Sequence, residues 1–143
     1  MNASGSEKLP PIIIGKAAKP RPFQKKSGAD LRFYYRSNPT AWMTMIIYQE
    51  WISGWDCKLR HQNRHILLFQ DNFSGHVPPV GLTNICVENF SPNLTPHVQP
   101  ADAGIIHCFK AHYRSKFNNR AIDRYDGDIS PLLIYEIDQL EAM

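Results

Sequence analysis

Residues 65–72 constrain this chain most, because a continuous apolar run there ends abruptly in a carboxylate. The segment reads His-Ile-Leu-Leu-Phe-Gln and is followed directly by Asp71 and Asn72. A short, uninterrupted apolar run of this kind predicts a central β-strand that is covered on both faces. Such a strand holds Asp71 rigidly at an edge of the sheet, where a pair of carboxylates can share a divalent metal ion.

A second isolated carboxylate, Asp102, lies within the segment 99–104. Paired with Asp71, it predicts metal-dependent phosphodiester chemistry. Each residue also has a purely structural interpretation. Asp and Asn are favoured in turns that follow strands, and an Asp just after Pro100 is a good cap for the start of a helix. The two residues by themselves leave both interpretations open.

The rest of the hydrophobic pattern predicts an α/β fold in one domain. Strands are expected over residues 10–15, 31–36, 65–70 and 84–90. A first helix begins at the capping residue Thr44 and ends before Asn63. Its apolar residues recur with helical spacing and are expected in the core; they are Tyr48, Trp51, Ile52, Trp55 and Leu59.

Two further helices are expected in the second half of the chain. One starts near Asp102, and its apolar face is formed by Ile105, Ile106, Phe109, Tyr113 and Phe117. The last starts at Ser130, an N-cap residue followed by proline at the first helical position. Ile129 and Ile134 are placed to pack together as a hydrophobic staple across this start.

Charge is unevenly distributed although the net charge is only +3. Cations interleaved with aromatic residues crowd residues 16–36, a pattern that can track a DNA backbone and equally describes a solvated loop. A second basic set lies on the helix that follows Asp102. The candidate nucleic-acid-binding residues are His76, Lys16, Lys19, Arg21, Lys25, Lys26, Lys110 and Arg114.

Cysteine usage argues for a reducing compartment, because three cysteines at wide spacing imply no disulfide framework. The chain has no apolar run long enough to span a membrane and no signal-peptide pattern, so an intracellular location is expected. Cys57 with His61 and Cys108 with His112 have helical i, i+4 spacing, which leaves a four-ligand zinc site as a distant alternative.

Several segments, taken in order, resemble the catalytic domain of the pogo/Tigger-type DDE transposases, the DDE superfamily endonucleases. That family carries its second acid in a strand-end Asp-Asn with a nearby His. Its third acid lies in a Gln-Pro-x-Asp-x-Gly segment about thirty residues later, which opens a helix with a Phe-Lys-x-x-Tyr stretch. The matching segments here are residues 71–76, 91–95, 99–106 and 109–114, with 2–16 and 41–44 upstream.

This resemblance, strongest over residues 2–125, implies a ribonuclease-H-like mixed sheet with flanking helices. It also implies a nuclear, DNA-binding protein in which three carboxylates hold Mg²⁺ or Mn²⁺ for strand cleavage and transfer. Asp71 matches the second acid and Asp102 the third, so both are expected as catalytic metal ligands. The resemblance also implies two kinds of partner: DNA, and either a second copy of the chain or a complementing transposase. It implies no association with a membrane.

The family's first acid has no counterpart in this sequence, because it belongs to a strand that precedes Asn2. Glu7 and Asp30 are the nearest other acids, and neither follows a predicted strand. Two carboxylates hold a hard cation weakly. We therefore expect an incomplete fold without its first strand and no cleavage by this chain alone. The alternative function is a domesticated, non-catalytic domain that binds DNA or protein.

Overall fold

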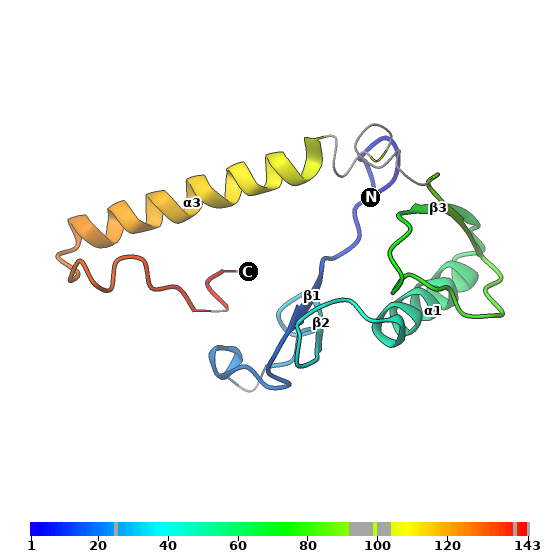
Figure 1. Ribbon diagram of the computed structural model, residues 1–143, viewed down its shortest axis with the longest axis horizontal. Coiled ribbons are helices and arrows are strands. Elements are labelled where there is room, and N and C mark those ends of the chain that lie inside the picture. Colours follow the sequence, from blue (N-terminus) through cyan, green and yellow to red (C-terminus); the bar gives the residue numbers. More distant parts are fainter. Residues whose placement is uncertain (25, 92–98, 100–103, 139, 143) are drawn as a thin grey trace. The chain divides into compact units, whose positions relative to one another are not determined.

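The structure is a computed structural model, and it describes residues 1–24, 26–91, 99, 104–138 and 140–142. Figure 1 shows its helices and strands in chain order. The chain divides into two compact units. Unit 1 comprises Met1–Ile47 and Ile137–Met143, and unit 2 comprises Tyr48–Glu136. Both contain short strands, so the mixed α/β class that the sequence predicts is confirmed.

Unit 1 is built on two parallel strands, β1 (Ile12–Gly15) and β2 (Tyr34–Ser37). The basic connection between them contains a short 3₁₀ helix, η1 (Arg21–Phe23). Phe23 is buried, and its ring packs edge-on against Phe33 at 5.8 Å and Tyr35 at 4.9 Å between ring centroids. The connection is therefore anchored by an aromatic cluster in the interior of unit 1.

Helix α1 (Met45–His61) begins and ends as the sequence predicts. The Thr44 hydroxyl accepts a hydrogen bond from the Ile47 N–H, the geometry of an N-cap. Asn63 adopts a left-handed conformation with φ of 51°, and the N–H groups of residues 63 and 64 donate to the carbonyls of Arg60 and Leu59. These two bonds form a Schellman motif, which satisfies the last carbonyls of the helix.

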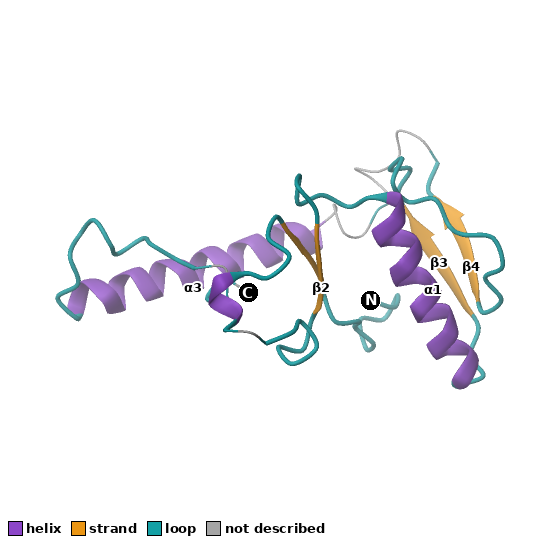
Figure 2. Cartoon of the chain, turned by 90° about the horizontal axis from the view of Figure 1, so that it is seen from below, coloured by secondary structure: helices purple, strands orange, loops and turns teal. Residues whose placement is uncertain are grey.

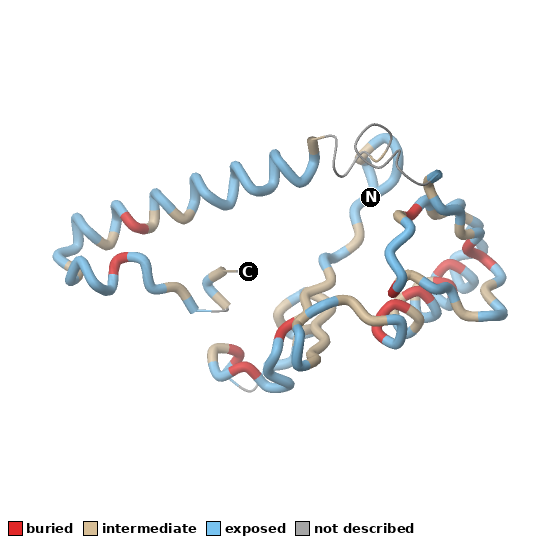
Figure 3. Tube along the Cα trace, viewed as in Figure 1, coloured by how far each residue is buried: buried red, intermediate tan, exposed pale blue. Residues whose placement is uncertain are grey.

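In unit 2, β3 (Ile66–Gln70) and β4 (Ile85–Asn89) pair in parallel, with Ile66 opposite Ile85. Helix α1 lies along one face of this pair (Figure 2). The core between them is apolar and contains Tyr48, Ile52, Leu59 and Ile85. Figure 3 shows this burial concentrated along α1 and at the start of β4.

The prediction that β3 is covered on both faces is wrong for the described residues. Alternate residues Leu67 and Phe69 are 53% and 54% exposed, because they point away from α1 and nothing described covers that face. The described strands also pair two by two, as two separate two-stranded sheets, rather than as one mixed sheet. Trp51 and Trp55 are half-buried and contact each other with tilted rings, so they line the edge of the core instead of filling it.

A buried carboxylate on α1 ties the helix to the start of β4. Asp56 Oδ1 accepts the N–H groups of Thr83 (3.1 Å), Asn84 (2.7 Å) and Ile85 (3.1 Å). Its Oδ2 accepts a 2.9 Å bond from the Arg60 guanidinium, one helical turn away. Burial raises the pKa of the Asp56 carboxyl, but the hydrogen bonds from Asn84, Arg60 and Thr83 outweigh burial and hold that pKa below its ordinary value.

Helix α3 (Ile106–Asp126) confirms the second predicted helix, but the third predicted helix does not form. Residues 131–135 make turns with i, i+3 bonds, such as Leu133 N–H to the Ser130 carbonyl. Tertiary contacts favour these turns over a helix. Arg120 and Arg124 both donate to the Glu136 carbonyl, at 2.7 and 2.8 Å, and Ile134 is buried.

Removing the Asp56 carboxylate should destabilise unit 2. In Asp56→Ala, three backbone N–H groups lose their acceptor, two of them at the buried residues Asn84 and Ile85, and we expect the free energy of unfolding to fall by about 3 kcal/mol. Urea denaturation followed by circular dichroism measures this. Lys58→Ala, an exposed change on the same helix, should stay within about 0.5 kcal/mol of wild type. Equal stability of the two variants would contradict the anchoring role.

Stability should also depend on pH through Asp56. Its folded-state pKa lies below the unfolded value of about 4, so its contribution is complete above that value and is lost as the pH falls through the folded-state pKa. The difference in unfolding free energy between wild type and Asp56→Asn should therefore be largest at neutral pH and shrink toward about pH 3. Denaturation series at several pH values test this, and a difference that stays constant would refute it.

Candidate functional site

The candidate site is the turn that directly follows β3, at the carboxyl ends of two parallel strands. Asp71 Oδ1 accepts a 3.3 Å bond from the Phe73 N–H, which makes an Asx-type turn. The His76 N–H then donates to the Phe73 carbonyl at 2.9 Å. Directly after the neighbouring strand β4, the Phe90 carbonyl accepts a 2.5 Å bond from the Asn72 amide. These bonds give residues 71–76 a defined conformation next to the end of the sheet.

Asp71 and His76 form a hydrogen-bonded pair, with 2.6 Å between Oδ1 and Nδ1. An ionised carboxylate can only accept, so the imidazole carries its proton on Nδ1, and Nε2 remains outside the pair. The two side chains are 36% and 24% exposed, which leaves the pair open to a ligand from solvent. The structure thus joins two residues that the sequence suggested separately.

The His76 ring is fixed by aromatic contacts as well as by Asp71. Tyr48 lies 4.9 Å away and Phe73 5.2 Å away, measured between ring centroids. Phe73 can take this place because residue 75 is glycine: a Cβ at Gly75 would lie 2.5 Å from the Phe73 ring. His76 is therefore held in a defined position within the turn.

Sequence reasoning missed Gln70, which ends β3 just before Asp71. Its buried amide accepts from the Tyr48 hydroxyl and donates to the His76 carbonyl and to Asn89 Oδ1. The position of Gln70 along the strand was the signal that could have identified it. Ile66, Leu68 and Gln70 alternate along the strand and share the face toward α1, so an amide at the third place requires partners inside the fold.

The second predicted acid, Asp102, lies outside the described residues, as does Lys25. The structure therefore does not test whether Asp71 and Asp102 approach each other. Within the described ranges, no group of three or more His, Cys, Asp or Glu side chains is arranged to hold a metal ion. Asp71 suits a hard cation as a single ligand, because Oδ2 accepts no hydrogen bond from the described residues while Oδ1 is engaged by His76.

Asp30 is one of the two other acids considered from the sequence, and its contacts give it a local structural role. Asp30 Oδ2 accepts the hydroxyl of Ser27 at 2.7 Å and the N–H of the same residue at 2.8 Å. These hydrogen bonds, the hydroxyl first, lower the pKa of the Asp30 carboxyl. Asp30 is thus the acceptor that closes a turn in unit 1.

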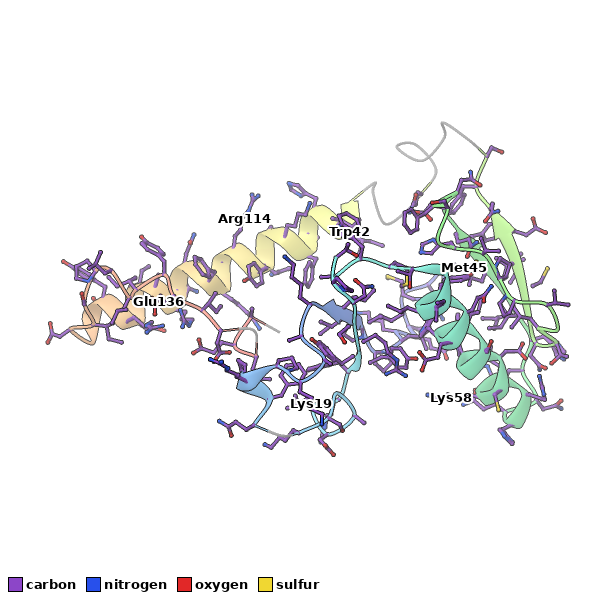
Figure 4. The ribbon with its side chains drawn as sticks, turned by 60° about the horizontal axis from the view of Figure 1, so that its bottom comes forward. Lys19, Trp42, Met45, Lys58, Arg114 and Glu136 are labelled. Atoms are coloured by element: carbon purple, nitrogen blue, oxygen red, sulfur yellow. The ribbon has the colours of Figure 1, made fainter. Side chains whose placement is uncertain are left out.

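The predicted nucleic-acid-binding cations that the structure describes are all exposed. Lys16, Lys19, Arg21 and Lys26 belong to the β1–β2 connection of unit 1. Lys110 and Arg114 lie one turn apart on α3, and Figure 4 shows Arg114 projecting from that helix. Their exposure is compatible with contacts to phosphates and is also what a solvated surface requires.

The zinc alternative gains no support from the described residues. Cys57 and Cys108 are both exposed, and no metal-ligand cluster forms around either. A pocket of about 420 Å³ beside α3 is lined by neither carboxylate nor imidazole groups; it is bounded by Asn118, Ala121, Ile122, Tyr125, Ile134 and Tyr135. The turn after β3 therefore remains the chemically stronger site.

Short parallel strands, a helix on one face and a strand-end carboxylate define an α/β protein with a carboxylate–histidine pair at the edge of its sheet. The chain matches the family model described as DDE superfamily endonuclease over residues 1–140. It belongs to that family, which confirms the resemblance seen in its motifs. No solved structure shows significant similarity to it.

Several curated proteins are similar in sequence to this chain. It is 37% identical over 113 residues to Tigger transposable element-derived protein 4 of Mus musculus, covering 79% of this chain and 22% of that protein. CENP-B homolog protein 2 of Schizosaccharomyces pombe is 32% identical, with 85% and 25% covered. Major centromere autoantigen B of Homo sapiens is 30% identical, with 88% and 20% covered. The chain thus spans a quarter or less of these relatives' lengths.

Proposed function

We propose that this chain is a DNA-binding domain of the DDE transposase type, with a ribonuclease-H-like fold and with Asp71 and Asp102 as its metal-ligating, catalytic positions. The reaction class is metal-dependent phosphodiester cleavage and strand transfer. The observation that carries the proposal is the placement of Asp71. A strand-end carboxylate in a defined turn, in a chain of this family, is where a catalytic acid belongs.

The metal in this proposal is Mg²⁺ or Mn²⁺, which when bound supplies Lewis-acid stabilisation of charge on phosphate oxygens. Asp71 would contribute Oδ2, the oxygen that His76 does not engage. His76 would hold the carboxylate in one orientation through Oδ1, as groups hydrogen-bonded to metal ligands commonly do. Asp71 and Asp102 are two carboxylates, and two carboxylates hold such an ion weakly, so we expect low affinity for Mg²⁺ and Mn²⁺.

DNA is the proposed partner, and the described cations supply the attraction. Lysine and arginine side chains bind phosphates without reading sequence. The basic connection of unit 1 and the Lys110–Arg114 pair on α3 are exposed and chemically suited to that role. Relatives named as transposable-element-derived and centromere proteins support a nuclear location for this chain. None of the helices in the described ranges combines the length and the hydropathy that a membrane span requires.

A second candidate function is a non-catalytic domain that binds DNA or another protein. One observation favours it: Asp71 is already engaged by His76 and Phe73, so its carboxylate has a structural task. The apolar side chains of Leu67 and Phe69, exposed on the face of β3 that points away from α1, suit a protein partner such as a second copy or a complementing transposase. Metal binding separates the two candidates.

Mn²⁺ titration tests the catalytic interpretation. We expect Asp71→Asn and Asp102→Asn each to weaken Mn²⁺ binding about tenfold or more, equivalent to about 1.4 kcal/mol, because each removes a charged ligand. Isothermal titration calorimetry or water-proton relaxation measures the affinity. Asp126→Asn, an exposed change at the end of α3, is the matched control and should bind as wild type does. Unchanged affinity in both site variants would favour the non-catalytic function.

DNA binding should depend on the described cations. Replacing Lys110 and Arg114 together by glutamine should weaken binding to any duplex, and the slope of log affinity against log salt should fall by about 0.9 for each phosphate that the variant no longer neutralises. Fluorescence anisotropy at several salt concentrations gives both quantities. Lys58→Gln on α1 removes an exposed cation outside the proposed set (Figure 4). If that control weakens binding equally, the loss of affinity reflects only the lower net charge and not the loss of specific phosphate contacts.

A further inference from the structure

Gln70 occupies the junction between the core of unit 2 and the candidate site. It is 9% exposed and is the last residue of β3, directly before Asp71. Its Oε1 accepts from the Tyr48 hydroxyl on α1. Its Nε2 donates to the His76 carbonyl at 2.8 Å and to Asn89 Oδ1 on β4 at 2.9 Å. One amide therefore joins the helix, both strands and the far end of the turn.

The partners of Gln70 fix which way its amide points. A carbonyl oxygen can only accept, so the group facing the His76 carbonyl must be the N–H₂ end. A flipped amide would set Oε1 against that carbonyl in a buried place, where unmatched acceptors are costly. The position of His76 and the orientation of Gln70 are thus coupled.

The same coupling reaches Asp71 through the imidazole. The His76 backbone is held at its carbonyl by Gln70 and at its N–H by Phe73, and its ring is held by Tyr48. Nδ1 of that ring then bonds Asp71 Oδ1 at 2.6 Å. Because Tyr48 contacts both Gln70 and His76, one helix side chain supports both residues that hold the turn in place.

We propose that Gln70 is a positioning residue of the site: one N–H of its amide holds the turn at the His76 carbonyl, the other ties that amide to Asn89 on β4, and His76 is thereby placed to orient the Asp71 carboxylate. The inference rests on the proposed function and extends it, since it names Gln70 as the group that would orient the metal-ligating carboxylate of Asp71. The geometry that it claims is independent of whether a metal binds. A test of the turn's conformation can therefore fail or succeed separately from Mn²⁺ titration.

Native-state hydrogen exchange by NMR on the full chain tests this proposal. The reporter is the His76 amide, which donates within the turn, and the reference is the Ile66 amide, which donates to Asn84 at the start of the sheet. In Gln70→Met, of similar length but without N–H donors, exchange at His76 should accelerate about tenfold while Ile66 stays protected. Nuclear Overhauser contacts between the His76 and Tyr48 rings should weaken in parallel.

Two further variants make the test specific. Gln70→Glu keeps the shape and the acceptor for Tyr48 but lacks both N–H donors, so it should accelerate His76 exchange as Gln70→Met does. Gln49→Met is the matched control, because Gln49 bonds the adjacent Val77 carbonyl at 3.1 Å from an exposed position; its effect at His76 should stay below about threefold.

Three results would overturn the positioning role: unchanged His76 exchange in the Gln70 variants, an equal acceleration in Gln49→Met, or loss of protection at Ile66 together with His76. The last would make Gln70 a general support of the sheet. If His76 exchange behaves as expected but no variant alters Mn²⁺ binding, Gln70 still positions the turn and the metal-binding proposal alone fails.

Discussion

The carboxylate of Asp56 accepts three consecutive backbone N–H groups at the start of β4 and a guanidinium on its own helix. By accepting them, Asp56 keeps the N–H groups of the buried residues Asn84 and Ile85 from being left unsatisfied. The bond set fixes α1 against the sheet at one end. Since α1 is the helix that packs on the β3–β4 pair, this attachment constrains where the other residues of that helix lie.

The candidate site depends on that placement. Tyr48, two turns before Asp56 on α1, reaches the end of β3 and bonds Gln70, and its ring packs on His76. One end of the helix is therefore attached to β4 by charge-assisted hydrogen bonds, and the other supports the turn that carries Asp71. A candidate acid held this way needs little reorganisation when it meets a ligand, which is the arrangement expected of a preorganised site.

Local signals predicted well wherever the partners lie close in sequence. The Thr44 cap and the end of α1 before Asn63 follow from bonds across three to five residues, and the strand ending at Gln70 follows from its apolar run. The predicted helix at Ser130 failed although its cap and proline were correct signals. Contacts of Glu136 with Arg120 and Arg124 favour a different backbone there, and tertiary contacts override local propensity.

The family, the α/β class and the place of Asp71 at the end of a strand could all be predicted from the residues, because motif order and hydrophobic period are properties of the chain alone. The pairing of Asp71 with His76, the role of Gln70 and the anchoring by Asp56 came only with the packed fold. Asp56 lies 27 to 29 residues from its backbone partners. A hydrogen bond over such a separation leaves no periodic trace in the sequence, since it exists only once the helix has packed on the sheet.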